Sequence, residues 1–295
     1  MTTYKIQSDD ITVVTTSAGA EICSITSNKT NTNYLWSGNP QYWRGRAPIL
    51  FPMVGCLREG KAKTGINDSC RMGRHGLARN MEFEMIHLCK SRITYALKSN
   101  SDTKDAYPYD FELHITYVAE GKTLRVHHSI KNQDTKEMPF CIGGHPAFHC
   151  PINKDENFED YQVRFSEKET ADCAYLTDDG LIDMSHSRQL LDNEDTIPLQ
   201  HDLFYDDALV FDSLKSRSVT LEHKETKQGV TLTFDDMDYL GVWSSANDGP
   251  FVALEPWTGT ATLSTEDDVF EHKRGIRILS PGELTRIEYQ ITVNE

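Results

Sequence analysis

Hydrophobic and polar residues alternate along much of the chain with a period of two. In FELHITYVAE (111–120), Phe111, Leu113 and Ile115 fall on one face, and TLRVHHSI and TRIEYQITV alternate in the same way. This period is typical of strands with one buried face. Further segments of this form are ITVVTT, ITYALK, YQVRFS, ALVFDS, SVTLEHK, GVTLTFDD, YLGVWSS and FVALEPW.

Turn signals such as AEGKT and KETKQG separate these segments, and no long stretch has a helical period. Many short antiparallel strands in 295 residues predict an all-β protein built as a large twisted antiparallel β-sandwich. Because no linker, repeat or low-complexity tract interrupts the pattern, we expect residues 1–295 to form a single domain.

Composition narrows the partners and the compartment. The net charge of −15 argues against nucleic acid and anionic membranes as partners, since both attract basic surfaces. The start MTTYKIQSDD has no signal pattern, and the apolar stretch APILFPMVGCL (47–57) is too short to span a bilayer. Seven cysteines without a CxxC motif favour a reducing, cytoplasmic location over a disulfide framework.

Two histidines stand outside the alternating strands. His75 lies in MGRHGLARN, directly before a glycine, and His145 lies in CIGGHPAFHC, after two glycines and before a proline. Glycine allows close approach of the backbone and proline fixes the chain, so both histidines sit on rigid irregular segments of the kind that carry sites. A structural role for either histidine, or a metal site that includes the flanking cysteines, remains an alternative on these residues alone.

Several charged and aromatic residues join them as candidates. Glu255 in VALEPWTG is a carboxylate at the apolar end of a strand, and Trp257 shares its parity and offers a flat face to a sugar ring. Asp207 precedes the strand ALVF. Arg44 and Arg46 in YWRGRAPILFP, and Arg79 in HGLARN, stand beside apolar or glycine-bearing segments, where arginine usually needs a partner or a ligand oxygen.

Six motifs in order carry a resemblance that covers nearly the whole chain. RAPILFPMVG, HGLARN, GGHPAF, DALVF, YLGVWSS and LEPWTG together resemble the aldose 1-epimerase (galactose mutarotase-like) family, in particular its LacX-like branch. The resemblance implies a β-supersandwich with a sugar-binding cleft on one face. It also implies an isomerase that acts on a small sugar, free or phosphorylated, as its partner.

The resemblance also assigns roles to individual residues. It implies that Glu255 is the general base, that His145 is the general acid and that His75 binds and polarises the sugar. Asp207 holds sugar hydroxyls in this interpretation. An arginine upstream of APILFP contacts the sugar, and WRGRAP offers both Arg44 and Arg46 for this role. The remaining candidates for substrate binding are Arg79, Trp243 and Trp257.

The chemistry agrees with these roles. Opening and re-closing an aldose ring requires one base at O1 and one acid at O5, so we expect neither a cofactor nor a metal. We also expect the side chains of His145 and Glu255 to lie several ångströms apart and to face each other across the cleft without a direct hydrogen bond. Three alternatives remain: a hexose-6-phosphate mutarotase that uses Arg44, Arg46 or Arg79, a non-catalytic sugar-binding protein, and a metal-dependent cupin-like enzyme that uses His75, His145 and Glu255.

Overall fold

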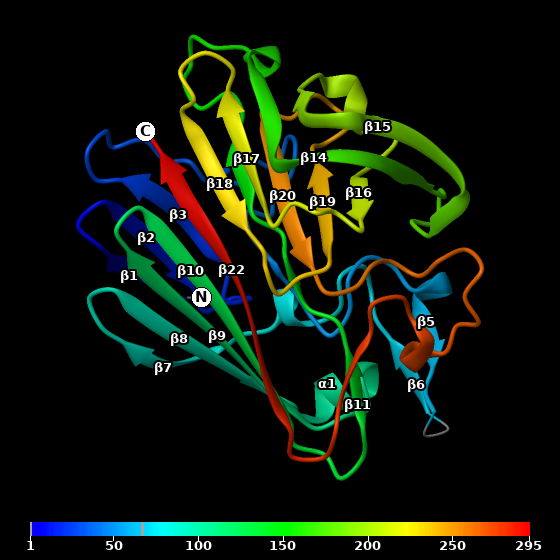
Figure 1. The fold of residues 1–295 in the computed structure, drawn as a ribbon. Helices are drawn as coiled ribbons and strands as arrows, with labels where there is room; N and C mark the ends of the chain where they lie inside the picture. Colours follow the sequence, from blue (N-terminus) through cyan, green and yellow to red (C-terminus); the bar gives the residue numbers. More distant parts are fainter. Residues whose placement is uncertain (1, 66–67) are drawn as a thin grey trace.

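The computed structural model describes residues 2–65 and 68–295, and these residues form mainly antiparallel strands (Figure 1). Within the described part of the chain the one α-helix is α1 (Ser101–Ala106), and none of its helices is long and apolar enough to cross a membrane. The prediction of a large antiparallel β-sandwich is therefore confirmed.

The larger sheet has nine strands in the order β15-β14-β17-β18-β22-β10-β9-β8-β7. Its strands are β7 (Glu84–Leu88), β8 (Arg92–Lys98), β9 (Phe111–Glu120), β10 (Thr123–Asn132), β14 (Tyr161–Leu176), β15 (Ile182–Pro198), β17 (Ser218–His223), β18 (Gly229–Thr233) and β22 (Leu284–Asn294). Buried and less buried residues alternate strictly along β10, because one face of the sheet covers the core. The C-terminal strand β22 lies between β18 and β10 in the interior of this sheet.

A second sheet of six strands has the order β16-β19-β20-β12-β4, with β13 paired to β20. Its strands are β4 (Ile49–Leu50), β12 (Gly143–Gly144), β13 (Ala147–His149), β16 (Leu209–Asp212), β19 (Tyr239–Trp243) and β20 (Phe251–Trp257). Leu240 and Leu254 on one face of this sheet belong to the same core cluster as Val126 and Tyr289 of the larger sheet. The other face of β19 and β20 forms the site.

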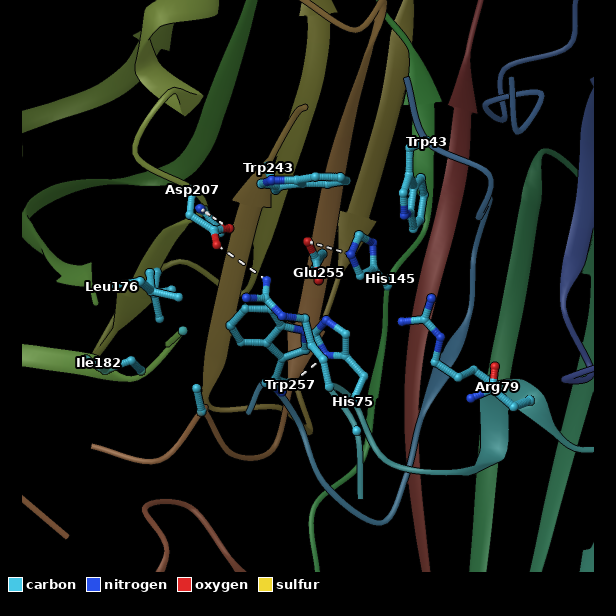
Figure 2. Close-up of a pocket in the computed structure, with 18 residues that line it drawn as sticks. Trp43, His75, Arg79, His145, Leu176, Ile182, Asp207, Trp243, Glu255 and Trp257 are labelled. Atoms are coloured by element: carbon cyan, nitrogen blue, oxygen red, sulfur yellow. Dashed lines mark hydrogen bonds and ion pairs between the residues drawn. The ribbon is translucent and has the colours of Figure 1, made fainter. Parts of the chain in front are cut away.

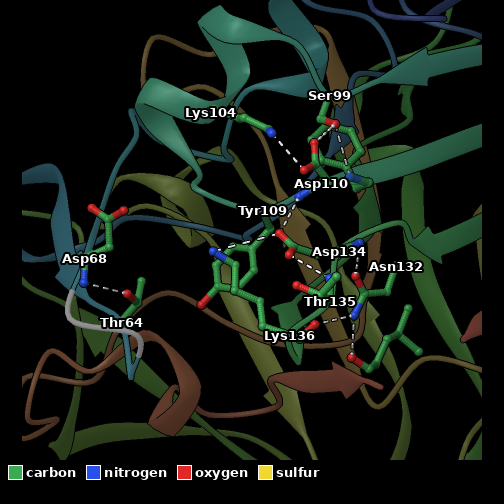
Figure 3. A network of polar contacts seen from close by, with 12 residues as sticks. Thr64, Asp68, Ser99, Lys104, Tyr109, Asp110, Asn132, Asp134, Thr135 and Lys136 are labelled. Atoms are coloured by element: carbon green, nitrogen blue, oxygen red, sulfur yellow. Dashed lines mark hydrogen bonds and ion pairs between the residues drawn. The ribbon is translucent and has the colours of Figure 1, made fainter. Parts of the chain in front are cut away.

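Short strands complete the fold. They are β1 (Thr3–Gln7), β2 (Ile11–Thr16) and β3 (Ile22–Ser27) in one sheet, the pair β5 (Lys61–Lys63) and β6 (Ser69–Arg71), and the pair β11 (Met138–Phe140) and β21 (Arg277–Leu279). A polar network fastens one end of the larger sheet (Figure 3). The Asp110 carboxylate accepts hydrogen bonds from Ser99 at 2.8 Å and Lys104 at 2.7 Å, and its backbone N–H donates to Asp134 at 3.0 Å. These contacts hold α1 and the turn after β10 against the start of β9.

The strands β14 and β15 go beyond the sequence-based expectation. YQVRFS predicts only the first six residues of β14, whereas the strand continues to Leu176 and pairs with β15 as a long twisted ribbon (Figure 1). Four register shifts interrupt this pairing, so the sequence lacks a sustained period of two. The turn of the ribbon, which includes Gly180, reaches the site described below.

Candidate active site

The floor of the site is the face of β19 and β20 that points away from the core between the two sheets. Gly241 pairs with Glu255 and Trp243 pairs with Ala253, so Trp243, Glu255 and Trp257 project to the same side of the sheet (Figure 2). They line a cavity of about 500 Å³. Seven predicted site residues line this one cavity: His75, Arg79, His145, Asp207, Trp243, Glu255 and Trp257.

Two glycines allow His145 to enter the cavity. A Cβ on Gly143 would lie 2.6 Å from the Trp257 ring, and a Cβ on Gly144 would lie 2.5 Å from the Tyr289 hydroxyl. The two rings therefore occupy the space that side chains would need, one against each glycine. His145 follows directly, and its backbone N–H donates to Pro48 O at 3.1 Å.

Aromatic rings enclose the His145 imidazole. It stacks on Trp43 with ring centroids 4.6 Å apart, and the ring of Trp243 meets it edge-on at 5.5 Å. The His145 side chain is 7% exposed and that of Glu255 is 2% exposed. Both ionisable groups are thus held in surroundings of low polarity, where electrostatic interactions are strong.

His145 and Glu255 touch each other directly. His145 Nε2 lies 3.3 Å from Glu255 Oε1, so the expectation that the two side chains would lie several ångströms apart is wrong (Figure 2). Among the described residues, Glu255 Oε2 and His145 Nδ1 have no hydrogen-bond partner.

The pKa values of this pair shift in opposite directions. Burial, together with the smaller effect of the positive charges of Arg79 and Arg74, lowers the pKa of His145 to about 3. Burial raises the pKa of Glu255 well above its ordinary value, and the negative charge of Asp207 adds to this effect. Both shifts favour the uncharged forms, in which Glu255 holds its carboxyl proton and the His145 ring carries a single N–H.

His75 lies on a strained turn beside the pair. Its φ of 69° is in the left-handed region, which non-glycine residues rarely adopt. Its Nδ1 accepts a hydrogen bond from the Gly55 N–H at 3.1 Å, which assigns the ring proton to Nε2. Burial lowers the pKa of His75, and the neighbouring His145 adds to the effect. The neutral ring therefore keeps one N–H available for donation.

Asp207 and Arg74 form the opposite end of the cavity. Asp207 also has a left-handed backbone, with φ 79°, and its Oδ1 accepts the Ala208 N–H at 2.8 Å. Its Oδ2 pairs with Arg74 Nη1 at 3.4 Å. The Gly180 turn of the β14–β15 ribbon covers Arg74, since a Cβ on Gly180 would lie 2.7 Å from the guanidinium.

Of the three arginines predicted to bind substrate, one lines the cavity and two lie outside it. Arg79 lines the cavity, burial lowers its pKa, and its guanidinium has no ion-pair or hydrogen-bond partner within residues 2–65 and 68–295. Arg44 is exposed outside the cavity. Arg46 also lies outside it, where Nε donates to Ser37 O at 3.0 Å and Nη1 is 4.0 Å from the Glu21 carboxylate. The structure thus does not bring Arg44 or Arg46 to the other candidates.

The chain is similar to known proteins over nearly its whole length. The family model described as aldose 1-epimerase matches residues 2–292. The chain belongs to the aldose 1-epimerase family. A relative in this family, the chromosomal protein LacX of Lactococcus lactis subsp. lactis, is 36% identical over 297 residues, which cover 99% of each chain. The resemblance to the LacX-like branch is confirmed.

Solved structures of similar proteins show the same fold. The galactose mutarotase related enzyme of Lactobacillus acidophilus is 32% identical, with a TM-score of 0.94 over 100% of this chain and 98% of the other. A galactose mutarotase-like protein of Lactobacillus casei is 26% identical, with a TM-score of 0.89 over 99% and 100% of the two chains. The galactose mutarotase-like fold expected from the motifs is therefore present in this member of the aldose 1-epimerase family.

Some residues that line this cavity are not among those predicted from the sequence. Arg74 directly precedes His75, and Trp43 directly precedes Arg44, so both lay inside motifs already singled out. Leu176 and Ile182 come from the ribbon, for which no sequence signal was recognised. No group of three or more metal-binding side chains occurs in the described part of the chain, and the absence of a metal stays a prediction.

Proposed function

We propose that the protein interconverts the α- and β-anomers of an aldose by general acid–base catalysis. The observation that carries this proposal is the contact of 3.3 Å between the His145 imidazole and the Glu255 carboxyl, buried in one cavity. Opposite pKa shifts in neighbouring groups are characteristic of acid–base pairs. Membership of the aldose 1-epimerase family supports the same chemistry.

The reaction uses the carboxyl proton that Glu255 holds. Its transfer from Glu255 to His145 gives a carboxylate and an imidazolium, the base and the acid of the reaction. The carboxylate takes the proton from O1, the bond between C1 and O5 breaks with its electrons going to O5, and the imidazolium protonates O5. Rotation about C1–C2 turns the aldehyde, and the same transfers in reverse close the ring on its other face.

The surrounding side chains orient the sugar in this mechanism. The Nε2–H of His75 is placed to donate to a sugar oxygen, because its Nδ1 is occupied by Gly55. The rings of Trp243 and Trp257 offer apolar faces next to Glu255. Asp207 accepts hydrogen bonds from sugar hydroxyls at the far end, with Arg74 holding its carboxylate in place.

Polarimetry of freshly dissolved α-anomers tests the proposal. We expect Glu255→Gln to lower the rate of mutarotation by at least about 100-fold, because proton transfer at O1 loses its base. Its thermal unfolding should stay cooperative. Glu120→Gln changes a carboxylate that is 69% exposed on the surface and serves as the matched control. Near-normal turnover of Glu255→Gln would disprove the base assignment, and an inactive wild-type protein that still binds sugar would favour the non-catalytic alternative.

A second candidate substrate is a hexose that carries a phosphate. The observation in its favour is the Arg79 guanidinium, which lines the cavity beside His145 and lacks an ion-pair partner among the described residues. An acid at O5 places C6 of the ring on the same side as this cation. If the phosphate binds there, Arg79→Gln should weaken the reaction of a 6-phosphorylated hexose more than that of the free hexose.

A further inference from the structure

The indole N–H of Trp257 has no function in the proposed mechanism. Trp257 lies on β20 two residues after Glu255, so both side chains project to the cavity side of the sheet (Figure 2). Only 5% of Trp257 is exposed, and its Nε1 is buried without a hydrogen-bond partner among the described residues. A buried indole N–H usually finds an acceptor, because burying an unpaired donor is costly.

Two glycines show how the Trp257 ring lies on the sheet. A Cβ on Gly143 of β12 would lie 2.6 Å from Trp257 Cδ1, and a Cβ on Gly241 of β19 would lie 2.6 Å from Trp257 Cζ2. Since β20 lies between these two strands, the edge of the ring from Cδ1 to Cζ2, which carries Nε1, crosses β20. The same Cβ on Gly241 would lie 3.3 Å from Glu255 Cβ, so this edge of the indole ends beside the catalytic carboxyl.

Glu255 carries the matching acceptor. Its Oε1 lies 3.3 Å from His145 Nε2, whereas its Oε2 is buried and lacks a partner within the described part of the chain. Burial raises the pKa of Glu255, and the Trp257 N–H acts in the opposite direction, as a donor does when it favours the ionised form of a carboxyl. A donor and an acceptor, each without a partner, are therefore buried on adjacent side chains of one strand face.

We propose that Trp257 is a positioning residue for the base, whose indole N–H donates to Glu255 Oε2 once the carboxyl proton has passed to His145. This inference rests on the proposed mutarotation. A small rotation of the carboxyl brings Oε2 towards the indole, and catalytic hydrogen bonds often tighten in this way only during the reaction. The bond stabilises the buried negative charge, and Oε2 keeps a second lone pair for the proton of O1.

The indole N–H resonances in NMR spectra test this hydrogen bond without turnover. The chain has four tryptophans, so isotope-labelled protein gives four such resonances, and Trp257→Phe identifies the one that belongs to Trp257. We expect this resonance to move downfield as the pH rises through the raised pKa of Glu255, because a carboxylate is the stronger acceptor. The movement should be absent in Glu255→Gln, which cannot ionise.

The kinetics of Trp257→Phe test the role of the bond in catalysis. Phenylalanine keeps an apolar ring beside the sugar and removes the donor, so we expect kcat to fall by about tenfold or more with little change in KM. Above the pKa of Glu255 the catalytic pair has lost its proton, and loss of the donor raises this pKa further. The basic limb of the kcat/KM profile should therefore move to higher pH.

Trp243→Phe is the matched control, because it removes another indole from the cavity. It should change KM through its contact with the sugar and leave the basic limb in place. The other ionisable groups around Glu255 are the same in both variants, namely His75, His145, Asp207, Arg74 and Arg79.

The outcomes separate this inference from the proposed function. An inactive wild-type protein would disprove the proposed function, and the resonance of the Trp257 N–H would still decide whether it bonds to Glu255. A resonance that does not follow the ionisation of Glu255 would overturn the hydrogen bond. A lower kcat in Trp257→Phe with an unmoved basic limb would make Trp257 merely structural and overturn the inference as well. Where Trp257→Phe does not fold, the comparison of the wild-type protein with Glu255→Gln still gives the answer.

Discussion

At the scale of single residues, Arg79 adds to the effect of burial on the protonation of His145 and His75. Among the charged neighbours that lower the pKa of His145, Arg79 has the largest effect, and it also lowers the pKa of His75. Burial and this cation together keep both rings neutral in the free protein. Since a lowered pKa means that the ring takes up a second proton only at more acidic pH, the pair keeps its working protonation state well below the ordinary histidine value of 6.5.

We expect kcat/KM to stay constant as the pH falls through 6.5 towards the pKa of about 3 for His145. Arg79→Gln removes a positive charge, so the acidic limb of the pH profile should move to higher pH. Arg44→Gln removes an exposed cation outside the cavity and should leave the limb in place. An acidic limb near 6.5 in the wild-type protein would contradict the assignment of His145 as a buried neutral ring.

Asp207 has a strained backbone and carries the carboxylate that is proposed to accept hydrogen bonds from the sugar. Glycine removes the cost of its left-handed φ of 79°, which is of order 1 kcal/mol. We expect Asp207→Gly to keep or raise the free energy of unfolding while it lowers kcat/KM, because the sugar loses an acceptor. Asp207→Asn retains the strained backbone and loses only the charge. Urea denaturation and polarimetry of both variants decide the point, and an active Asp207→Gly protein would refute a role in substrate binding.

At the scale of elements, β12 is a strand without side chains between two aromatic rings. Trp257 occupies the cavity side of Gly143, and Tyr289 of β22 occupies the core side of Gly144. The strand thereby holds the acid of the proposed mechanism at a fixed distance from the larger sheet. A methyl group on either glycine would displace a different ring, so the two substitutions should have different consequences.

We expect Gly144→Ala to destabilise the protein by about 1–3 kcal/mol, because the new methyl overlaps the buried Tyr289 ring. Gly143→Ala should instead lower kcat, because the new methyl overlaps the Trp257 ring and the Pro256 carbonyl, both close to Glu255 in β20. Thermal unfolding and turnover of both proteins measure the difference. Adding Tyr289→Phe to Gly144→Ala removes the hydroxyl nearest to the new methyl and should recover part of the stability. Equal effects of both glycine substitutions would contradict the separate roles.

Elements with a sustained period of two were predictable from the sequence. ITVVTT, FELHITYVAE and FVALEPW coincide with β2, β9 and β20. The long ribbon was not, because its register shifts break the period and most residues of β15 are exposed. For the same reason Leu176 and Ile182 were not recognised as walls of the cavity, since no local pattern indicates where the ribbon turns back.

Glycine and proline beside His75, His145 and Glu255 marked positions that the fold brings into one cavity. The spacing of residues in the motifs could not show which of the predicted arginines line the cavity. Trp43 enters the cavity while Arg44 points to solvent and Arg46 is held by Ser37 and Glu21. This choice depends on contacts with residues far away in the sequence.

At the scale of the whole molecule, buried histidines make stability depend on pH. Burial lowers the pKa of His75, of His128 to about 4 and of His145 to about 3. The unfolded chain therefore binds more protons than the folded protein below pH 6.5, so stability falls as the pH falls towards these folded values. The raised pKa of Glu255 acts in the opposite direction above its ordinary value of 4.5.

The contribution of a single buried histidine to the pH dependence of stability can be measured at His128, since it lies in the core outside the cavity. Its shift from 6.5 to about 4 corresponds to about 3 kcal/mol of stability lost as the pH falls across this range. His128→Phe keeps a flat ring but cannot be protonated, so its free energy of unfolding should vary less with pH. Urea denaturation at several pH values measures the slope. His186→Phe, at a side chain that is 75% exposed, is the control, and equal slopes in all three proteins would contradict the prediction.

The position of β22 has a consequence for biosynthesis. Residues 284–294 join β18 to β10, so the two blocks of the larger sheet stay separate on the ribosome until the last of these residues has emerged. Until then β18 and β10 each expose an unpaired edge, which is a template for pairing with other nascent chains. Tyr289, which lies against the glycine before His145, also arrives in this last segment. A ribosome that stalls before β22 would therefore hold a chain in which His75, His145 and Glu255 are already synthesised but the larger sheet behind their cavity is incomplete.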